Sequence, residues 1–328
     1  MKGTTWRNWK KLLLRKEAMT FLLVVIVAVV LLLFSRYFLN PTNLDSLQTS
    51  IAPSSIIAVG MMVLLITGMF DLSVGSIMGL SGVVTAIFLT LNVPTPFAIL
   101  LGLFCGTLLG LVNGLLIAIA GVNPLITTIG MMFVARGISE VLLVGKGREG
   151  YRNFSQAFIN LGTGKFLGLY YMFWMMIVLL IVTQLYLNRF KHGRTLYYIG
   201  GNAEAAALMG FDITKVRILT FMLSGFLAAF AGIISTARYE MANRYMGQGM
   251  HMSIIISCLI GGGSLAGGQG SVIGAFLGVT FMSVLNNSFN LLEIEPQWQN
   301  VVIGVILILV VTSDGYLALR KMRALGKI

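Results

Sequence analysis

Residues 19–38 read MTFLLVVIVAVVLLLFSRYF, a stretch in which Arg36 is the single charged side chain. A helix needs about 20 apolar residues to cross the hydrocarbon core of a bilayer, and this stretch supplies them. It lacks an Ala-x-Ala cleavage pattern and is longer than the apolar region of a signal peptide. We therefore expect it to be retained as the first membrane span, preceded by a basic amino-terminal tail over residues 1–18.

The composition of the whole chain agrees with a membrane protein. Of its 328 residues, 57% are hydrophobic and 10% are charged, whereas soluble domains carry about 25% charged residues. The mean hydropathy is +0.90. Because the chain has 38 glycines and few alternating segments of strand length, its pattern favours helices over a barrel. The predicted fold class is all-α, a polytopic helical bundle in the membrane.

Apolar runs divide the chain into about ten transmembrane helices. The basic residues lie at the ends of these runs, so the net charge of +12 is explained by membrane orientation, and we expect no nucleic-acid partner. The positive-inside rule favours both termini on the cytoplasmic side, with a carboxy-terminal tail over 314–328. The expected spans are 19–38, 51–69, 76–91, 96–119, 124–145, 169–189, 216–236, 251–264, 270–290 and 298–313.

The fourth and fifth spans share a spacing pattern with the ninth and tenth. Under the ten-span count the two pairs have opposite orientations, and inverted repeats of this kind are typical of transporters. Helix packing offers a second explanation for glycines at four-residue spacing, because small residues let backbones approach closely. The matched positions are Gly102, Gly106, Asn113, Pro124 and Gly130 with Gly274, Gly278, Asn286, Pro296 and Gly304.

No set of residues for catalysis is apparent. The two histidines, His192 and His251, lie in a loop and at the edge of a span, and no nucleophile, base and oxyanion set can be assembled around them. Residues 162–166 have the wrong spacing for a phosphate-binding P-loop and lack the hydroxyl that follows its lysine. We expect no enzymatic activity and no cofactor in this chain. Arg136 and Glu140, four residues apart in the fifth span, are expected to form an ion pair.

Polar residues in or beside the spans are candidates for a translocation path. Asp71 and Ser73 interrupt an apolar run, where they either cap a half-helix or contact a solute. Amide side chains can exchange hydrogen bonds with an uncharged, hydroxylated solute, but they can equally join one helix to another. The amide candidates are Asn113, Asn123, Asn286 and Asn287.

Residues 200–212 predict a short, capped helix in a cytoplasmic loop. Asn202 suits the N-cap, Glu204 complements the helix dipole in the first turn, and Gly210 suits the C′ position. Helices of about two turns are marginal in water, so this one needs a surface to rest on. That surface is either a partner protein or the chain's own spans. The candidate coupling residues are Asn202, Ala203, Glu204, Ala205, Ala206, Leu208, Met209 and Gly210.

Three stretches together resemble the permease subunits of ABC importers of the ribose, xylose, arabinose and galactoside type. GGNAEAAALMG at 200–210 is similar to the coupling loop of that family, and DLSVGS at 71–76 to its Asp-Leu-Ser-Val-Gly-Ser motif. IGGGSLAGGQGS at 260–271 is similar to its second glycine motif. The three occur in the family's order across nearly the whole chain. One departure is Met69-Phe70 before Asp71, where the family usually has Gly-Ile.

This resemblance implies one permease domain over residues 1–328, with ten spans in the cobalamin-importer-like arrangement and a cytoplasmic coupling loop at 190–215. It implies three partners: a second copy or a related permease, a cytoplasmic ATPase with two nucleotide-binding halves that holds ATP and Mg²⁺, and a periplasmic or tethered sugar-binding protein. The expected function is import of a monosaccharide or similar small hydroxylated solute across the bacterial inner membrane. The alternative is a self-contained, ion-coupled secondary transporter, which usually has more ionisable residues in its spans.

Overall fold

The computed structural model describes residues 16–147 and 150–324. The first apolar run forms α2 (Lys16–Phe34), and the second helix, α3 (Pro41–Ile66), begins well before the expected start at residue 51. Asn40 caps α3, because its side chain accepts a hydrogen bond from the backbone N–H of Thr42 at 3.0 Å, and Pro41 occupies the first turn. The first turns of α3 are polar, so hydropathy alone places its start too late.

The remaining apolar helices lie close to their expected boundaries, except that the last of them extends beyond its expected end at residue 313. Seven helices in the described part of the chain are long and apolar enough to cross a membrane, and three shorter apolar helices accompany them. The protein is therefore an all-helical, polytopic membrane protein, as its composition predicts. Their bounds are α4 (Val74–Thr90), α5 (Thr95–Ala118), α6 (Pro124–Leu142), α8 (Tyr171–Arg189), α11 (Ile213–Tyr239), α12 (Met250–Ile260), α13 (Val272–Leu291) and α14 (Pro296–Ala324).

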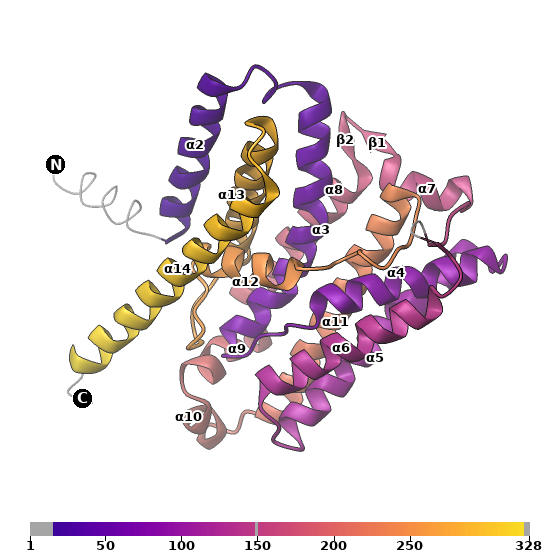
Figure 1. Ribbon diagram of the computed structural model, residues 1–328. Helices are drawn as coiled ribbons and strands as arrows, with labels where there is room; N and C mark the ends of the chain where they lie inside the picture. Colours follow the sequence, from indigo (N-terminus) through magenta and orange to yellow (C-terminus); the bar gives the residue numbers. More distant parts are fainter. Residues whose placement is uncertain (1–15, 148–149, 325–328) are drawn as a thin grey trace.

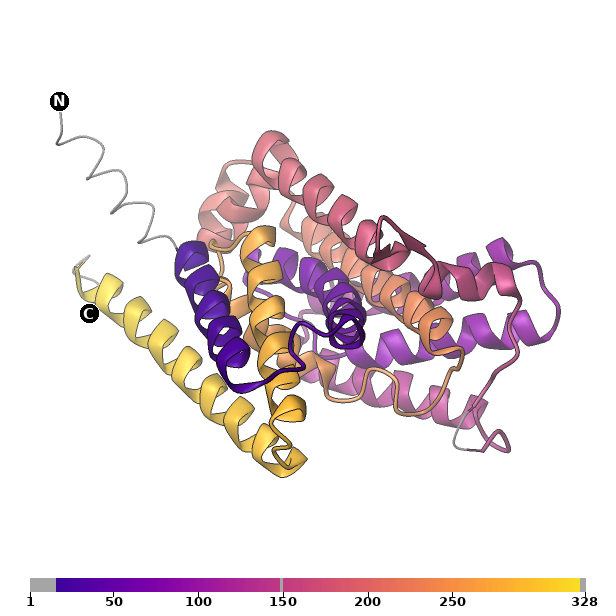
Figure 2. The same ribbon diagram turned by 90° about the horizontal axis from the view of Figure 1, so that it is seen from above.

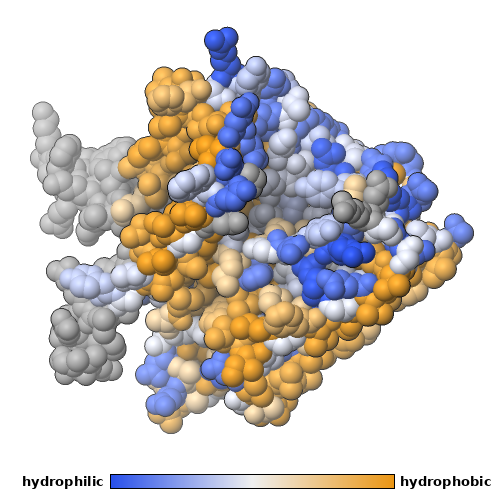
Figure 3. Space-filling model, in the orientation of Figure 1, coloured by the Kyte–Doolittle hydropathy of each residue, from blue (hydrophilic) through white to orange (hydrophobic). Residues whose placement is uncertain are grey.

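Helices α3 and α11 form the centre of the bundle (Figures 1 and 2). Most side chains of α3 are buried, and α11 packs against α3, α4 and α5. On the outside, α2 and α14 lie at one edge, and large apolar side chains cover α2 and the edge formed by α5 and α6 (Figure 3). Leu33 and Phe34 of α2 are examples, with 77% and 74% of their surface exposed. An apolar outer surface is what a lipid environment requires.

Glycines bring helix backbones together on both sides of the bundle. A Cβ added at Gly106 of α5 would stand 2.7 Å from the carbonyl oxygen of Gly225 in α11. In α13, Gly274 and Gly278 lie in the same way against the carbonyls of Gly261 and Ser257 at the end of α12. Close helix packing thus accounts for glycines in both halves of the chain.

Several elements lie outside the expected spans. Between α6 and α8 the chain forms α7 (Gln156–Thr163) and a small antiparallel hairpin of β1 (Lys165–Phe166) and β2 (Leu169–Tyr170). The expected cytoplasmic loop contains two helices, α9 (Lys191–Gly201) and α10 (Ala203–Leu208). Helix α14 extends to Ala324, so most of the tail expected from residue 314 is helical. Residues 1–15 and 325–328 of the two expected tails lie outside the described residues.

Candidate functional site

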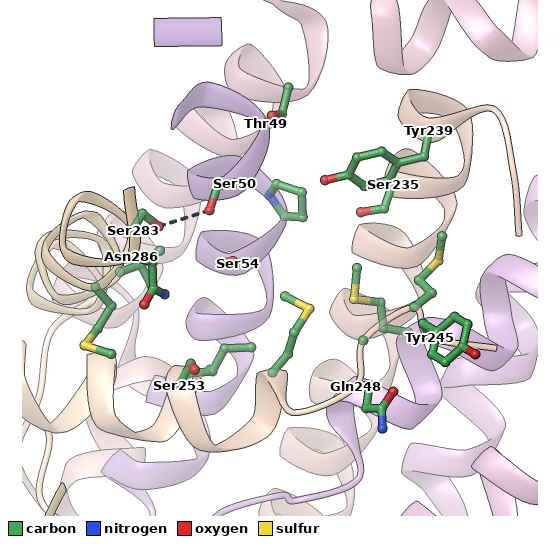
Figure 4. A pocket seen from close by; sticks show the side chains of 18 of the residues that line it. Thr49, Ser50, Ser54, Ser235, Tyr239, Tyr245, Gln248, Ser253, Ser283 and Asn286 are labelled. Atoms are coloured by element: carbon green, nitrogen blue, oxygen red, sulfur yellow. Dashed lines mark hydrogen bonds between the residues drawn. The ribbon is translucent and has the colours of Figure 1, made fainter. Parts of the chain in front are cut away.

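A cavity of about 540 Å³ lies among α3, α11, α12 and α13, beside the loop 240–249 that joins α11 to α12 (Figure 4). Five methionines contribute to its wall, namely Met78, Met241, Met246, Met250 and Met282. None of the described residues that line the cavity is charged. The polar lining residues are Thr49, Ser50, Ser54, Ser235, Tyr239, Asn243, Tyr245, Gln248, Ser253, Ser257, Ser283 and Asn286.

Some hydroxyl and amide groups that line the cavity have hydrogen-bond partners, and others have none among the described residues. On one wall, the hydroxyl of Ser50 donates to that of Ser283 at 3.4 Å (Figure 4). By contrast, Oγ of Ser235 and Oδ1 of Asn286 are buried and have no hydrogen-bond partner among the described residues. These two side chains come from α11 and α13, so unsatisfied polar groups lie on two sides of the cavity.

The loop 240–249 is held over the cavity by contacts with three other elements. A guanidinium N–H group of Arg136 in α6 donates to the carbonyls of Arg244 and Met246, at 2.9 and 3.0 Å. Ala242 exchanges two backbone hydrogen bonds with Tyr151. Gly247, at φ 72°, lies against Gly75 of α4 with no room for a Cβ on either residue. The loop is therefore a fixed cover rather than a free connection.

These contacts change the interpretation of Arg136. The sequence favoured an ion pair with Glu140, one turn further along α6. In the structure Glu140 is exposed, and the hydrogen bonds of Arg136 go to the backbone of the loop. Arg136 thus positions a cover of the cavity from the neighbouring helix.

Asp71, Ser73 and Asn113 meet in a buried cluster away from the cavity. Asp71 accepts hydrogen bonds from both the backbone N–H and the hydroxyl of Ser73, and from Ser224 of α11 at 3.4 Å. Asn113 of α5 donates to Ser73 at 3.0 Å. Ser73 occupies the N-cap position of α4, but its side chain makes no cap hydrogen bond. The cluster joins α4, α5 and α11, so its geometry is that of a helix junction.

The other amide candidates occupy three different environments. Asn123 is exposed and caps α6, because its side chain accepts from the backbone N–H of Leu125 at 2.8 Å. Asn287 and Asn43 exchange two side-chain hydrogen bonds, at 2.6 and 3.1 Å, which join α13 to α3. Asn286 alone among the candidates lines the cavity.

The short helix α10 has the capping pattern that the sequence predicts. The side chain of Asn202 accepts from the backbone N–H of Ala205 at 2.9 Å. At the other end Gly210 adopts φ 84°, its N–H donates to Ala207, and the N–H of Phe211 donates to Ala206. This pair of bonds is a Schellman motif, which satisfies carbonyls at a helix end. Two caps therefore define a helix of only six residues.

The residues of α10 divide into a buried side and an exposed side. Ala206 is fully buried, whereas 91% of Leu208 and 60% of Met209 is exposed. Phe211 stacks on Tyr198 of α9, with ring centroids 6.2 Å apart, which fixes α10 to the preceding helix. One side of α10 therefore packs on the chain itself, and the other side leaves apolar side chains uncovered.

Two of the three sequence motifs, at 200–210 and 260–271, meet the end of α3 at the base of α10. Gly200 lies against the carbonyl of Ile66, the last residue of α3, and that carbonyl accepts from the N–H of Gly268 at 2.9 Å. A Cβ at Gly267 would stand 2.6 Å from the carbonyl of Gly200. We call this contact of residues 66–68, 200–201 and 266–270 the glycine junction. Only glycines allow three backbone segments to approach so closely.

Tyr197 of α9 adds a side-chain bond to the glycine junction. Its hydroxyl donates to the carbonyl of Gly270 at 3.0 Å. Burial raises the pKa of Tyr197, and the charge of Glu17 raises it further, so the hydroxyl keeps its proton. Glu17 in turn accepts a hydrogen bond from Ser271, the N-cap of α13, at 2.9 Å. The junction therefore connects α9 to the first turns of α2 and α13.

A known protein family matches most of the chain. Residues 43–311 match the family described as the permease component of branched-chain amino acid transport systems. The chain belongs to this permease family. The permease is the membrane component of an ABC transporter and not its ATPase.

Curated relatives cover most of the permease. It is 34% identical to the ribose import permease protein RbsC of Haemophilus influenzae, over 84% of this chain and 85% of the relative. It is 35% identical to the L-arabinose ABC transporter permease protein AraH of Azospirillum brasilense, over 85% and 81%. For AraH of Escherichia coli K12 the identity is 36%, over 84% and 83%. No solved structure matches the permease.

The cavity and the glycine junction of the permease lie at different levels of the same helix. Thr49, Ser50 and Ser54 of α3 line the cavity, and Ile66 at its end belongs to the junction. With a rise of 1.5 Å per residue, the two sites are about 18 Å or more apart along the helix axis. Pro53, which also lines the cavity, lies inside α3 next to Ser54. A single helix therefore connects the base of α10 to the cavity.

Most residues of the cavity were missed by the sequence analysis of the permease. Serine, threonine and methionine are ordinary packing residues in membrane helices, so nothing in their spacing sets the lining ones apart. Ser50 and Ser54 do lie four residues apart on one face of α3, which is the one local signal of a polar stripe. The stripe alone does not identify its opposite wall, which comes from residues 235–286.

Proposed function

We propose that the permease is the membrane subunit of an ABC importer for an uncharged monosaccharide or a similar small hydroxylated solute. The observation that carries this proposal is the lining of the cavity, where hydroxyls, amides and methionines surround a space with no charged side chain among the described residues. Hydroxyl and amide groups can both donate to and accept from sugar hydroxyls. The names of RbsC and AraH, which refer to ribose and L-arabinose, support the same class.

An amino acid fits the cavity less well, although the family description names branched-chain amino acids. An amino acid carries a carboxylate and an ammonium group at neutral pH. Transfer of an ionised group from water into a site without a counter-charge is costly, whereas an uncharged polar group needs only hydrogen bonds. The chemistry of the lining therefore favours a sugar over a zwitterion.

The proposed assembly contains two permeases, either identical or related, each with ten spans in the cobalamin-importer-like arrangement with inverted repeats. Both termini and the loop 190–215 are placed in the cytoplasm of a bacterial inner membrane, and residues 1–328 act as one domain. A cytoplasmic ATPase with two nucleotide-binding halves binds ATP and Mg²⁺. A periplasmic or tethered binding protein delivers the sugar to the opposite side. The basic residues at the cytoplasmic ends support this orientation.

In this assembly α10 is the element that contacts the ATPase. Leu208 and Met209 offer an uncovered apolar surface, and methionine adapts to a partner's shape. A displacement of α10 would be passed through Gly200 of the glycine junction to the end of α3 and to the turn before α13. Asn286 contacts the solute, while the Asp71 cluster, Asn123 and the Asn287–Asn43 pair hold helices in place.

Substitution of Leu208 tests the proposed role of α10. Leu208→Arg should abolish both sugar uptake and copurification of the ATPase, because it puts a charge into an apolar contact, while membrane insertion is unchanged. Leu167→Arg is the matched control: Leu167 is 77% exposed in the loop between β1 and β2. Ala206→Arg is not diagnostic, since Ala206 is fully buried. Normal uptake by Leu208→Arg would overturn the proposal.

Reconstitution distinguishes an ABC importer from an ion-coupled carrier. Proteoliposomes with the permease alone and an imposed proton or sodium gradient should accumulate no labelled D-ribose or L-arabinose. Addition of the ATPase, the binding protein and ATP should produce accumulation of one of them. Accumulation driven by the gradient alone would reject the ABC mechanism.

A further inference from the structure

We propose that the cavity among α3, α11, α12 and α13 is a sugar-binding chamber contained within a single permease chain. This inference rests on the proposed function for the class of solute, but it adds a site. The cavity is lined by helices of one chain and by the loop 240–249, and it is open on the side where Tyr239 and Tyr245 are exposed. A solute in this chamber would be bound without any residue of the second permease.

Two unsatisfied polar atoms are the strongest indication of a ligand. Ser235 is 1% exposed, and its hydroxyl has no partner among the described residues. A buried hydroxyl without a hydrogen bond costs about 1–3 kcal/mol, so folded proteins rarely leave one without a reason. Oδ1 of Asn286 is also buried and unpartnered. Figure 4 shows the two side chains on opposite sides of the same space.

The walls of the cavity fit the two kinds of surface that a sugar ring offers. Met241, Tyr245 and Met246 belong to the loop, and apolar, polarisable groups of this kind suit the C–H face of a ring. Ser50, Ser54 and Ser283 lie on α3 and α13, where hydroxyls can meet the hydroxyls of the ring. The volume of about 540 Å³ lies in the range of roughly 300–1,000 Å³ that small-molecule sites occupy.

The cover of the cavity also fits a binding chamber. Arg136 holds the loop from α6, and its hydrogen bonds go to the backbone carbonyls of Arg244 and Met246. The guanidinium of Arg136 thus stabilises the loop 240–249, but Arg136 is not one of the residues that line the cavity. A chamber built in this way selects uncharged solutes and excludes a sugar phosphate, because no counter-ion lies in its described lining.

Direct binding tests the chamber. The full-length permease in lipid nanodiscs, with and without its ATPase, should bind radiolabelled D-ribose or L-arabinose at one saturable site per chain. Unlabelled sugar should compete, whereas ribose 5-phosphate and L-leucine should not. Ser235→Ala should weaken binding by about tenfold, the effect of one lost hydrogen bond. Binding that charged solutes displace equally well would overturn the proposal.

Ser55→Ala is the matched control for Ser235→Ala. Ser55 lies on α3, is fully buried, and also has an unpartnered hydroxyl, but it does not line the cavity. Its substitution should leave the affinity for sugar unchanged. Equal effects of the two substitutions would place the binding site elsewhere and reject the chamber.

A cysteine at Ser54 gives a second measurement that does not depend on affinity. Ser54→Cys is made in a variant in which Cys105 and Cys258 are replaced by alanine, so that a thiol-specific reagent reports on the cavity alone. The bound sugar should slow the reaction at least several-fold, and L-leucine should not. Unchanged reactivity, together with sugar uptake by the complete importer, rejects the chamber but keeps the proposed function. Failure of the complete importer to take up any uncharged sugar rejects the proposed function itself.

Discussion

The α-carbon of Gly200 lies so close to the carbonyl oxygen of Ile66 that no β-carbon fits between them. Gly200 lies in the last turn of α9, next to α10, and Ile66 ends α3. The contact therefore joins the loop 190–215 of the permease directly to α3, most of whose side chains are buried. Since the same carbonyl also accepts from Gly268, any displacement of Gly200 affects the turn before α13 as well.

Substitution of Gly200 by alanine should uncouple the permease. The added methyl group meets backbone atoms of Ile66 and Gly268, which cannot move aside as a flexible side chain does. We expect sugar uptake and substrate-stimulated ATP hydrolysis to fall at least tenfold. Gly201→Ala is the control, because nothing lies within 4 Å of a Cβ at Gly201. Equal activity of the two variants would show that the junction does not transmit motion.

Asp71 should prove to be a structural residue. Asp71→Leu removes the acceptor of hydrogen bonds from Ser73 and Ser224, and each buried donor left without a partner costs about 1–3 kcal/mol. We expect a lower thermal unfolding temperature and a poor yield. Asp71→Asn keeps an acceptor oxygen and should preserve both stability and uptake. Stable protein that fails to transport would instead assign Asp71 to the path.

Arg136 should control the mobility of the cavity's cover. Arg136→Gln shortens the side chain and removes the charge, so the hydrogen bonds to Arg244 and Met246 are lost. Hydrogen bonds to charged groups contribute about 1.5–3 kcal/mol each. Amide hydrogen exchange over 240–249 should therefore become faster, with no change in α13. Unaltered exchange in the loop would mean that Tyr151 and Gly75 suffice to hold it.

The hairpin should be sensitive to alkaline pH through Lys165. Its ammonium donates to Asp45 at 2.6 and 2.8 Å, and this bond raises the pKa of Lys165 above its ordinary value of 10.5. Stability from a raised pKa is fully present below the unfolded-state value and is lost as the pH rises through the folded-state value. The pair is exposed, so we expect a small effect that salt weakens.

Thermal unfolding of wild type and Lys165→Met measures this contribution. The difference between them should be present at about pH 8 and should disappear as the pH rises through the raised folded-state pKa of Lys165, where the side chain loses its charge. Addition of about 1 M salt at pH 8 should also reduce it. A difference that persists at high pH would show that packing of the side chain, rather than its charge, stabilises the hairpin.

The sequence predicted the parts of the fold that depend on local chemistry. Hydropathy located the helices, and the capping pattern of Asn202 and Gly210 predicted α10 correctly, because caps act within a few residues. The start of α3 was wrong because its first turns are polar. Helix α9 was not predicted, because the basic and aromatic residues between Lys191 and Gly201 have a low mean hydropathy, which is typical of a loop between spans.

Contacts between residues far apart in the chain could not be predicted from sequence patterns. The motifs at 200–210 and 260–271 were identified separately, but their meeting with the end of α3 at Ile66 depends on how α3, α9 and α13 pack. Arg136 was paired with Glu140 because they are neighbours on one helix, whereas its partners lie more than 100 residues away. Asn286 and Asn287 are adjacent in the chain, yet Asn286 lines the cavity whereas Asn287 bonds to Asn43 of α3.

The uncharged lining of the cavity has an electrical consequence. Moving one elementary charge across a membrane involves about 2.3 kcal/mol per 100 mV of potential. A neutral sugar in a cavity without titratable side chains among its described residues carries no such charge and exchanges no proton. In the proposed importer the membrane potential would therefore neither drive nor oppose passage of the sugar, and a cell whose potential has collapsed would still accumulate the solute for as long as it can supply ATP.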